Sequence, residues 1–261
     1  MSIDLTRRFP RNGDREGDAR KILRRLLTGI GLAALAMPLI CAIPAARAET
    51  REEFWPEFDA FFKMDERLRL FLMASATRTE DIGSSGGSSG FENGQVGVHL
   101  DYTLQPFLRT NLREEDWQSN RYVWMRVGYR YIEDFDDWSG GENRGILELN
   151  VRHPIADEFS LTGRLRWELR DIDGSYSNRY GVRFGAERPF SVGERMYVPY
   201  AHVELLYDTR FDTWNRQRYQ AGIEIAINDR WRVEPYLVHQ DDSRSETGNL
   251  NALGLILKYS R

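Results

Sequence analysis

The stretch from Phe159 to Glu187 constrains the fold more than any other part of the chain, because apolar and polar residues alternate in it. Nearly every second residue is apolar or glycine, and the residues between them are mostly charged. A period of two places the two sets on opposite faces of a β-strand. The pattern is interrupted once by a run rich in Asp, Gly, Ser and Asn, which favour turns. The stretch therefore predicts a β-hairpin with one apolar face and one charged face.

The same alternation continues from Arg67 to the C-terminus and predicts ten strands, each about 10–13 residues long. Short connections alternate with longer polar ones, except at residues 105–120, where a long connection replaces a short one. The short connections expected are 64–66, 154–157, 189–194 and 228–230, and the longer ones are 79–91, 133–143, 171–178, 208–215 and 241–249. This pattern predicts an all-β, antiparallel, up-and-down transmembrane β-barrel of about 10–12 strands, with short periplasmic turns and longer outer loops.

The first 48 residues predict a cleaved signal peptide. A segment rich in arginine precedes an apolar run over 26–43, and Ala46-Arg47-Ala48 offers a small-x-small site for cleavage after Ala48. Pro38 and Pro44 break the run, which is short for a membrane anchor. A twin-arginine signal at Arg24-Arg25 and a lipoprotein cysteine at Cys41 remain as alternatives. We therefore expect an exported protein in the bacterial outer membrane.

The rest of the chain divides into a lead-in and the barrel. Residues 49–66 contain Pro56, and an eleventh crossing would make the strand number odd, so this segment is expected to be an N-terminal lead-in or a partial strand. Residues 67–261 are expected to form the barrel. Cys41 is the only cysteine, which excludes disulfides after cleavage. The chain holds 36 Lys and Arg against 40 Asp and Glu, and many of the basic residues lie before Ala48, so an acidic remainder argues against nucleic-acid binding.

Aromatic residues at the strand ends favour a membrane barrel over a soluble one, because aromatic side chains concentrate at the two membrane interfaces. The interface residues predicted at the short-turn side are Tyr102, Phe159, Tyr197, Trp231 and Tyr259. Those predicted at the other side are Tyr129, Tyr131, Trp167, Tyr180, Tyr207 and Tyr219. The apolar face would then contact lipid. The alternative is a soluble periplasmic β-barrel binding module with its apolar face inside.

The charged face becomes the lumen of such a barrel. The residues predicted to line it are Arg69, His99, Asp101, Arg126, Arg130, Glu148, Arg152, Arg164, Arg166, Glu168, Arg170, Arg179, Arg183, Glu187, His202, Glu204, Arg218, Glu224, Arg232 and Glu234. Two interpretations stay open. The arginines would favour anions in an open pore, or Arg and Glu side chains would cross-link and fill a narrow lumen. The expected role is therefore a passive channel for small, anionic solutes or a structural barrel.

No pattern in the chain identifies a catalytic centre, a metal site or a cofactor site. His99 with Asp101 and His202 with Glu204 each place a histidine and a carboxylate on one face, which would suit a general base in a lipid- or lipopolysaccharide-modifying enzyme. Neither pair has an adjacent nucleophile in the sequence, so no enzymatic activity is expected. The acidic runs near Glu133 lack the ordered spacing of a calcium loop. The partners expected are outer-membrane lipid and the export and barrel-assembly machinery.

Three short segments of the chain share one style, in which a polar turn leads into a strand. They are Asp65–Leu70 after the Trp-containing segment Trp55–Phe58, then Asp157–Leu161 and Asn228–Val233. In these segments the chain resembles, over residues 50–261, an uncharacterised family of bacterial outer-membrane β-barrel proteins whose domain begins with a Trp-containing strand. The resemblance implies a barrel fold and an outer-membrane location, and it brings no activity or catalytic residues.

Overall fold

The computed structural model describes residues 50–80, 90–104, 123–135, 141–156, 159–193, 195–243 and 248–261. The expectations for the signal peptide, for cleavage after Ala48 and for the connection at 105–120 lie outside these residues. Among the residues that are described, no helix is long and apolar enough to span a membrane.

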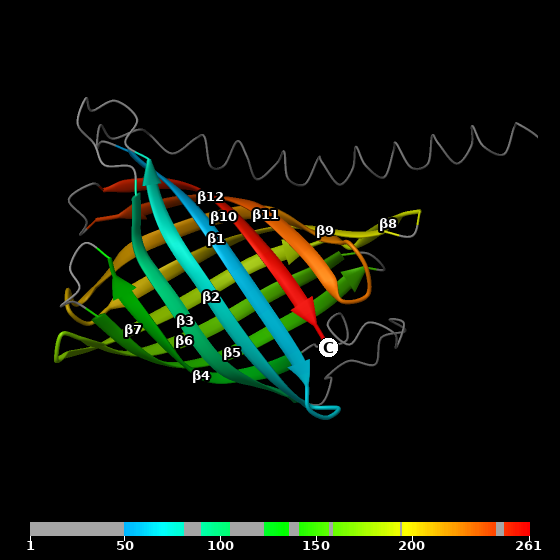
Figure 1. Ribbon diagram of the computed structural model, residues 1–261, viewed down its shortest axis with the longest axis horizontal. Helices are drawn as coiled ribbons and strands as arrows, with labels where there is room; N and C mark the ends of the chain where they lie inside the picture. The colour runs from blue at the N-terminus through cyan, green and yellow to red at the C-terminus, as the bar shows by residue number, and fades with distance from the viewer. Residues whose placement is uncertain are drawn as a thin grey trace, which may run out of the picture.

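The described chain folds into a 12-stranded sheet that closes on itself as a barrel (Figure 1). The strands are β1 (Thr50–Lys63), β2 (Leu68–Glu80), β3 (Gly90–Thr103), β4 (Val123–Asp134), β5 (Gly141–Ala156), β6 (Phe159–Ile172), β7 (Ser175–Glu187), β8 (Phe190–Val192), β9 (Arg195–Asp208), β10 (Thr213–Ala226), β11 (Trp231–Asp242) and β12 (Asn249–Ser260). Each long strand pairs with a strand on both sides, and only the 3-residue β8 pairs with β9 alone. The all-β barrel predicted from the alternation is confirmed. Closure leaves the barrel no free edge at which another chain could add a strand.

The barrel closes through a parallel ladder between β1 and β12, whereas all other neighbouring strands are antiparallel. The ladder runs from Thr50 opposite Asn249 to Phe61 opposite Ser260. A parallel closure follows from an odd number of long strands, because the first and last strands then run in the same direction. The expectation of a purely antiparallel barrel therefore fails at this one ladder.

Strand β1 replaces the expected lead-in at residues 49–66. It has 14 residues and pairs along its length with both β2 and β12. The ladder with β2 skips Trp55 and Pro56 and resumes at Glu57. Proline has no backbone N–H to donate, so a paired strand that contains it loses a ladder hydrogen bond at that position. The prediction of a lead-in was wrong because the interruption at Pro56 does not prevent a full strand.

The two ends of the barrel carry different connections (Figure 1). At the end that we call the turn end, β1 meets β2, β5 meets β6, β10 meets β11, and the chain finishes at Arg261. The opposite, loop end carries the start of β1 and the connections from β2, β4, β6, β9 and β11. At the turn end, the backbone N–H groups of Arg67 and Leu68 donate to the carboxylate of Asp65 over 2.6 Å, and these bonds hold the pKa of that carboxyl below its usual value.

The connection expected as a long loop at 171–178 is a tight turn. Strand β6 continues to Ile172 and β7 starts at Ser175, so only Asp173 and Gly174 lie between them. Both residues have positive φ angles, 51° and 80°, as a two-residue hairpin turn requires. The polar composition of this segment reflects strand ends that project beyond the apolar part of the barrel, and it does not mark a loop.

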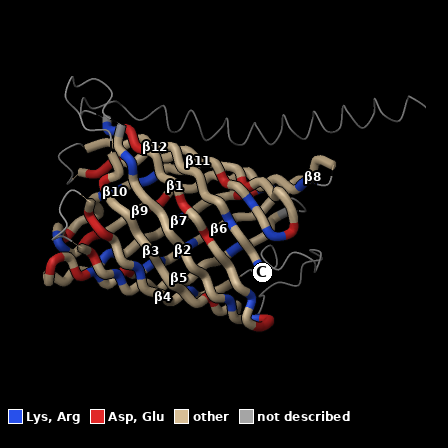
Figure 2. Tube along the Cα trace, in the orientation of Figure 1, with Lys and Arg blue, Asp and Glu red and all other residues tan. Residues whose placement is uncertain are grey.

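The apolar face of the strands points outward and the charged face inward, which excludes the alternative of a soluble barrel with an apolar interior. Leu165, Leu169 and Phe184 are exposed on the outside, while Glu168 and Arg170, on the same strand as the two leucines, are buried. Figure 2 shows Lys, Arg, Asp and Glu along the strands as well as at both ends of the barrel. The charged side chains of buried strand residues such as Glu168 and Arg170 lie in the lumen and not on the outer wall.

The aromatic residues predicted for the interfaces lie on the outer wall in two groups. Tyr102, Tyr129, Trp167 and Tyr180 are exposed, and Tyr131, Phe159, Tyr197, Tyr207, Tyr219, Trp231 and Tyr259 are half-buried. At the loop end, ring contacts connect Trp167, Tyr180, Tyr207 and Trp214 in sequence, with centroids 5.7–6.4 Å apart. At the turn end, ring contacts connect Phe58, Trp231, Tyr259 and Phe62. The strands between these groups carry mostly aliphatic side chains.

Replacing Trp231 by alanine is expected to lower the free energy of unfolding by about 2 kcal/mol, because it removes ring contacts to Tyr259 at 4.9 Å and to Phe58 at 6.3 Å. Urea unfolding of the barrel in lipid vesicles, followed by tryptophan fluorescence and gel mobility, measures this change. Tyr176→Ala is the matched control, because Tyr176 is 83% exposed beyond the loop-end rings. Equal stability of the two variants would contradict a stabilising role for the turn-end group.

Candidate functional site

The lumen holds a cavity of about 880 Å³, and every long strand contributes residues to its lining. Thr77 and Asp173 line it at the loop end, and Pro189 lines it at the turn end. The cavity therefore extends along the barrel from one end to the other.

The structure places all the residues predicted for the lumen on the inner face of the barrel. Those that line the cavity are Arg126, Arg130, Glu148, Arg152, Arg164, Arg166, Glu168, Arg179, Arg183, Glu187, His202, Glu204, Arg218, Glu224, Arg232 and Glu234. The others, Arg69, His99, Asp101 and Arg170, are buried in the inner wall. The period-two alternation is sufficient to predict these residues, because every second residue of a strand faces the lumen.

Charge is distributed unevenly around the cavity. The arginines that line it from β4 to β7 are Arg126, Arg130, Arg144, Arg152, Arg164, Arg166, Arg179 and Arg183, and the carboxylates are Asp134, Glu142, Glu148, Glu168, Asp173 and Glu187. From β11, β12 and β1 the charged lining residues are Arg232, Lys258, Glu57, Asp59 and Glu234. The strand order places β5 and β6 across the lumen from β11, β12 and β1. A basic wall therefore faces a more acidic one.

One carboxylate at the turn-end side of the basic wall serves two arginines. Asp101 is 0% exposed and accepts hydrogen bonds from Arg69 Nε over 2.9 Å and from Arg126 Nε over 2.6 Å. The guanidinium groups also lie over aromatic rings, Arg69 at 4.3 Å from Phe61 and Arg126 at 4.2 Å from Phe71. Such stacking adds to the ion pairs where water is excluded. Asp101 is thus fully occupied as a structural counter-ion.

Two further carboxylates in the middle of the wall are also shared. Glu148 lies 2.6 Å from Arg166 and 3.7 Å from Arg164, with Arg126 at 4.0 Å. Glu204 forms an ion pair with Arg164 and lies 3.8 Å from Arg218. Both carboxylates are 2% exposed. Both also line the cavity, where guanidinium groups surround their oxygens.

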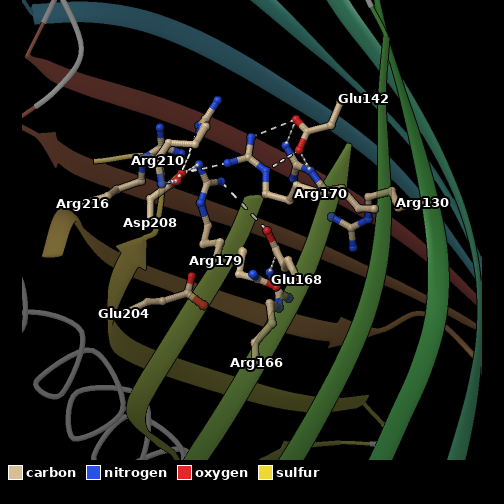
Figure 3. Close-up of polar contacts among 12 residues, drawn as sticks. Arg130, Glu142, Arg166, Glu168, Arg170, Arg179, Glu204, Asp208, Arg210 and Arg216 are labelled. Atoms are coloured by element: carbon tan, nitrogen blue, oxygen red, sulfur yellow. Dashed lines mark hydrogen bonds and ion pairs between the residues drawn. The ribbon is translucent and has the colours of Figure 1, made fainter. Parts of the chain in front are cut away.

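The loop end repeats this arrangement (Figure 3). Arg170, Arg179 and Arg210 converge on Asp208, with nitrogen–oxygen distances of 2.8, 2.9 and 3.0 Å. Arg170 also pairs with Glu142, which accepts from Arg144 over 2.7 Å as well. The pair between Arg170 on β6 and Asp208 on β9 crosses the intervening strand β7. Arginines here outnumber the carboxylates that hold them.

The surplus of guanidinium groups leaves donors directed at the cavity. Each guanidinium has five N–H groups, whereas each carboxylate has about four acceptor positions. Arg183 makes no hydrogen bond or ion pair with any described residue, although it lines the cavity. The side chain of Arg130 makes one long hydrogen bond, which its Nη1 donates to Oε1 of Gln95 over 3.4 Å. The lumen is therefore a water-accessible surface rich in unused cationic donors.

The structure does not form the histidine–carboxylate pairs considered for catalysis. His99 is 1% exposed, and neither ring nitrogen has a partner among the described residues. Its ring stacks on Phe71 at 5.1 Å and covers Gly128, where a Cβ atom would lie 2.1 Å from Nδ1. The ring of His202 stacks on Tyr200 at 5.7 Å, and no bond to Glu204 accompanies it. Both histidines pack against the wall, and neither forms a hydrogen bond with its expected carboxylate among the described residues.

Aromatic and apolar side chains also occupy part of the lumen, which the sequence analysis missed. Phe61, Phe71 and Met73 form one buried cluster. Tyr236, Val238 and Ala252 form another, with Trp55 and Tyr200 packed against it. The alternation also places these residues on the inner face, but the predicted lumen lining included only charged residues and histidines. The lumen is therefore smaller than its diameter suggests, and it is lined with aromatic rings on the side near β1.

Metal-binding geometry is not found in the described strands and turns, where no group of three or more His, Cys, Asp and Glu side chains is arranged to hold an ion. The acidic residue Asp242 accepts hydrogen bonds from Arg216 Nε over 2.8 Å and from Asn215 Nδ2 over 3.2 Å.

Among solved structures, the chain is similar to LpxR from Salmonella typhimurium. The two share 10% sequence identity with a TM-score of 0.42, and the match covers 73% of this chain and 83% of that chain. The expectation that the protein is not an enzyme is withdrawn. At this level of similarity the match assigns no reaction and no catalytic residue to the chain.

Family comparison covers most of the barrel. Residues 52–251 match the family described as protein of unknown function (DUF2490), and the comparison with curated proteins found no match. The matched range begins in β1 and ends in β12, so it includes the strands on both sides of the closure. The chain therefore belongs to the DUF2490 family of proteins of unknown function.

Proposed function

We propose that the barrel spans the bacterial outer membrane and that its lumen gives passage to small anionic solutes. Support for the membrane location comes from the outer wall. Aliphatic side chains such as Leu165 and Leu253 are exposed there, and the two aromatic groups bound this apolar zone at its ends. A surface of this kind is unstable in water and is typical of contact with lipid.

The cavity that extends between the two ends of the barrel is the observation that carries the proposed transport role. Ion pairs in the lumen, such as Arg126 with Asp101 and Arg164 with Glu204, connect strands that are neighbours or next neighbours. Such pairs hold side chains along the wall. They leave the axis to the cavity, which favours an open lumen over a cross-linked plug.

The balance of donors and acceptors in the wall accounts for the preference for anions. The carboxylates Asp101, Glu148 and Glu204 are almost completely buried behind guanidinium groups. Arg130, Arg183 and Arg218 line the cavity itself. Among the residues that line the cavity from β4 to β7, arginines outnumber carboxylates, and this excess of positive charge favours anions electrostatically.

The proposed partners follow from the proposed location. Export through the signal peptide ending near Ala48, insertion by barrel-assembly machinery and contact with outer-membrane lipid are all part of this hypothesis. Recovery of the protein from soluble periplasm after cell fractionation would contradict it.

Reconstitution into planar bilayers tests the transport role. We expect stepwise conductance, and we expect the reversal potential in a KCl gradient to show chloride preferred over potassium. A barrel that inserts but remains silent would support a purely structural role instead. A preference for potassium would contradict the electrostatic argument.

Arg130→Gln is expected to reduce the chloride preference, because it removes a cavity-lining charge that has no ion pair to disrupt. The matched control is Arg230→Gln, in the exposed turn between β10 and β11, where the charge lies outside the lumen. The shift in reversal potential measures the effect. An equal shift for both variants would assign selectivity to the barrel mouth and not to the lumen wall.

A further inference from the structure

We propose that the wall formed by β6 and β7 binds a tetrahedral oxyanion of the phosphate class between Arg164, Arg166 and Arg183. The inference rests on the proposed function, because the ion has to enter the lumen to reach this wall. The proposal specifies the class of solute and the position of its binding site, neither of which follows from the transport role alone.

The first observation is a pair of like charges in register. Arg164 on β6 lies directly opposite Arg183 on β7, and both face the cavity. Like charges directly opposite each other on a sheet destabilise it. The adjacent pair on this face has Arg166 opposite Gly181, so a third guanidinium projects from the next inward position without a side chain facing it. A bound anion would offset this repulsion.

The second observation is that protein carboxylates neutralise only part of this cluster. Arg164 and Arg166 both contact Glu148, Arg164 also pairs with Glu204, and Arg166 also pairs with Glu168 at 3.3 Å. These three glutamates are shared further with Arg126, Arg218 and Arg179. Arg183 interacts electrostatically with Glu148 and Glu204 but forms no ion pair with a described residue. The cluster therefore lacks a counter-charge at Arg183.

The third observation is the shape of the wall around Arg183. The inward positions on either side of it along β7 are Gly181 and Gly185. A Cβ atom at Gly185 would lie 2.8 Å from Thr162 Oγ1 and 2.6 Å from His202 Cβ, so the glycine allows both side chains to approach. Thr162 and His202 line the cavity beside the arginines. A hydroxyl and an imidazole thus add neutral hydrogen-bonding groups to the guanidinium cluster.

The choice of arginine selects the class of anion. A guanidinium presents a planar fork that donates two parallel hydrogen bonds to a carboxylate or a phosphate, which a point charge cannot do. Lys258 is the one lysine among the residues that line the cavity, against many arginines. Three forks from two strands can be matched by the four oxygens of phosphate or sulfate, whereas a carboxylate offers two oxygens. Chloride offers no directional acceptor geometry.

The test is binding of inorganic phosphate to the full barrel purified in detergent, measured by titration calorimetry at constant ionic strength. The wild-type protein is expected to bind phosphate, and chloride is expected not to displace it at equal concentration. Arg183→Gln is expected to weaken binding about tenfold or more, since a charge-assisted pair of hydrogen bonds is lost. Arg183→Lys, which keeps the charge and loses the fork, is expected to show an intermediate loss.

Arg230→Gln serves as the matched control, because it removes one arginine from the exposed turn-end surface. Unaltered phosphate binding in Arg183→Gln would overturn the proposal, as would equal weakening in the control. If Arg183→Gln fails to form a heat-modifiable barrel, the comparison of Arg183→Lys with wild type decides the question. Anion-selective conductance without phosphate binding would remove this site but keep the transport role. Phosphate binding in a silent barrel would keep the site and remove transport.

Discussion

Asp101→Asn is expected to lower the free energy of unfolding by about 3–5 kcal/mol, because it leaves two buried arginines without their common carboxylate. Asp101 is completely buried, and Arg69 and Arg126 both direct hydrogen bonds at it. Asparagine has the same shape, so the substitution changes charge with little change in packing. Urea unfolding in lipid vesicles gives the free energy, and the fraction of fast-migrating barrel on an unheated denaturing gel gives an independent measure of folding.

Asp229→Asn is the matched control for this variant, because Asp229 lies exposed in the turn between β10 and β11. Its effect is expected to stay within about 0.5 kcal/mol. The double variant Asp101→Asn with Arg126→Gln should lose less than the sum of the single losses, since the second change removes an uncompensated charge. If Asp101→Asn were as stable as wild type, the arginine–carboxylate clusters would not be what holds the inner wall together.

Gly254→Ala is expected to destabilise the barrel by about 3 kcal/mol through a steric clash. An added Cβ atom would lie 2.0 Å from Cζ of Tyr236, which is directly opposite on β11. The tyrosine is 7% exposed and also covers Gly222 on β10, where a Cβ atom would lie 2.7 Å from its own Cβ. The ring would have to leave its position over Gly254 to make room for the added Cβ atom. The variant is expected to yield less heat-modifiable barrel and to unfold at lower urea concentration.

Gly163→Ala provides the comparison, because the nearest atom to a Cβ there is the carbonyl oxygen of Arg183 at 3.9 Å. We expect this variant to be as stable as wild type or slightly more stable, since alanine restricts the unfolded chain. Adding Tyr236→Ala to Gly254→Ala should recover part of the lost stability by removing the clash. Equal stability of the two alanine variants would show that the Tyr236 ring is not fixed in this position.

From Arg67 onward, the alternation predicted the position of each of the ten long strands and the side that its residues face. Arg164 and Leu165 are adjacent in sequence, and their opposite placement follows from the period of two. The alternation could not predict the strand number. Strand β1 contains Pro56, and its membership in the sheet depends on pairing with β12, which is about 200 residues away in the sequence. Closure of a barrel is a property of the whole sheet and has no local signal.

The candidate site was predictable as a set of residues but not as an arrangement. Arg170 pairs with Asp208 across β7, and this contact depends on the relative register of three strands. The isolation of Arg183 is also invisible in the sequence, where carboxylates lie close by at Glu168 and Glu187. Glu187 instead accepts a hydrogen bond from Nη2 of Arg152 over 3.2 Å. Which arginine pairs with which carboxylate depends on the three-dimensional arrangement of the strands, and the sequence alone does not determine it.

The parallel pairing of β1 with β12 has a practical consequence for determining sidedness. Thr50 lies at the loop end, while Arg261 lies at the turn end beside Lys63, whose N–H donates to its carbonyl over 2.7 Å. Epitopes fused ahead of Thr50 and after Arg261 would therefore emerge on opposite sides of a bilayer that the barrel crosses. An antibody or protease applied to intact cells would reach only one of them. One labelling experiment on two fusions thus reads out which mouth of the barrel faces the medium.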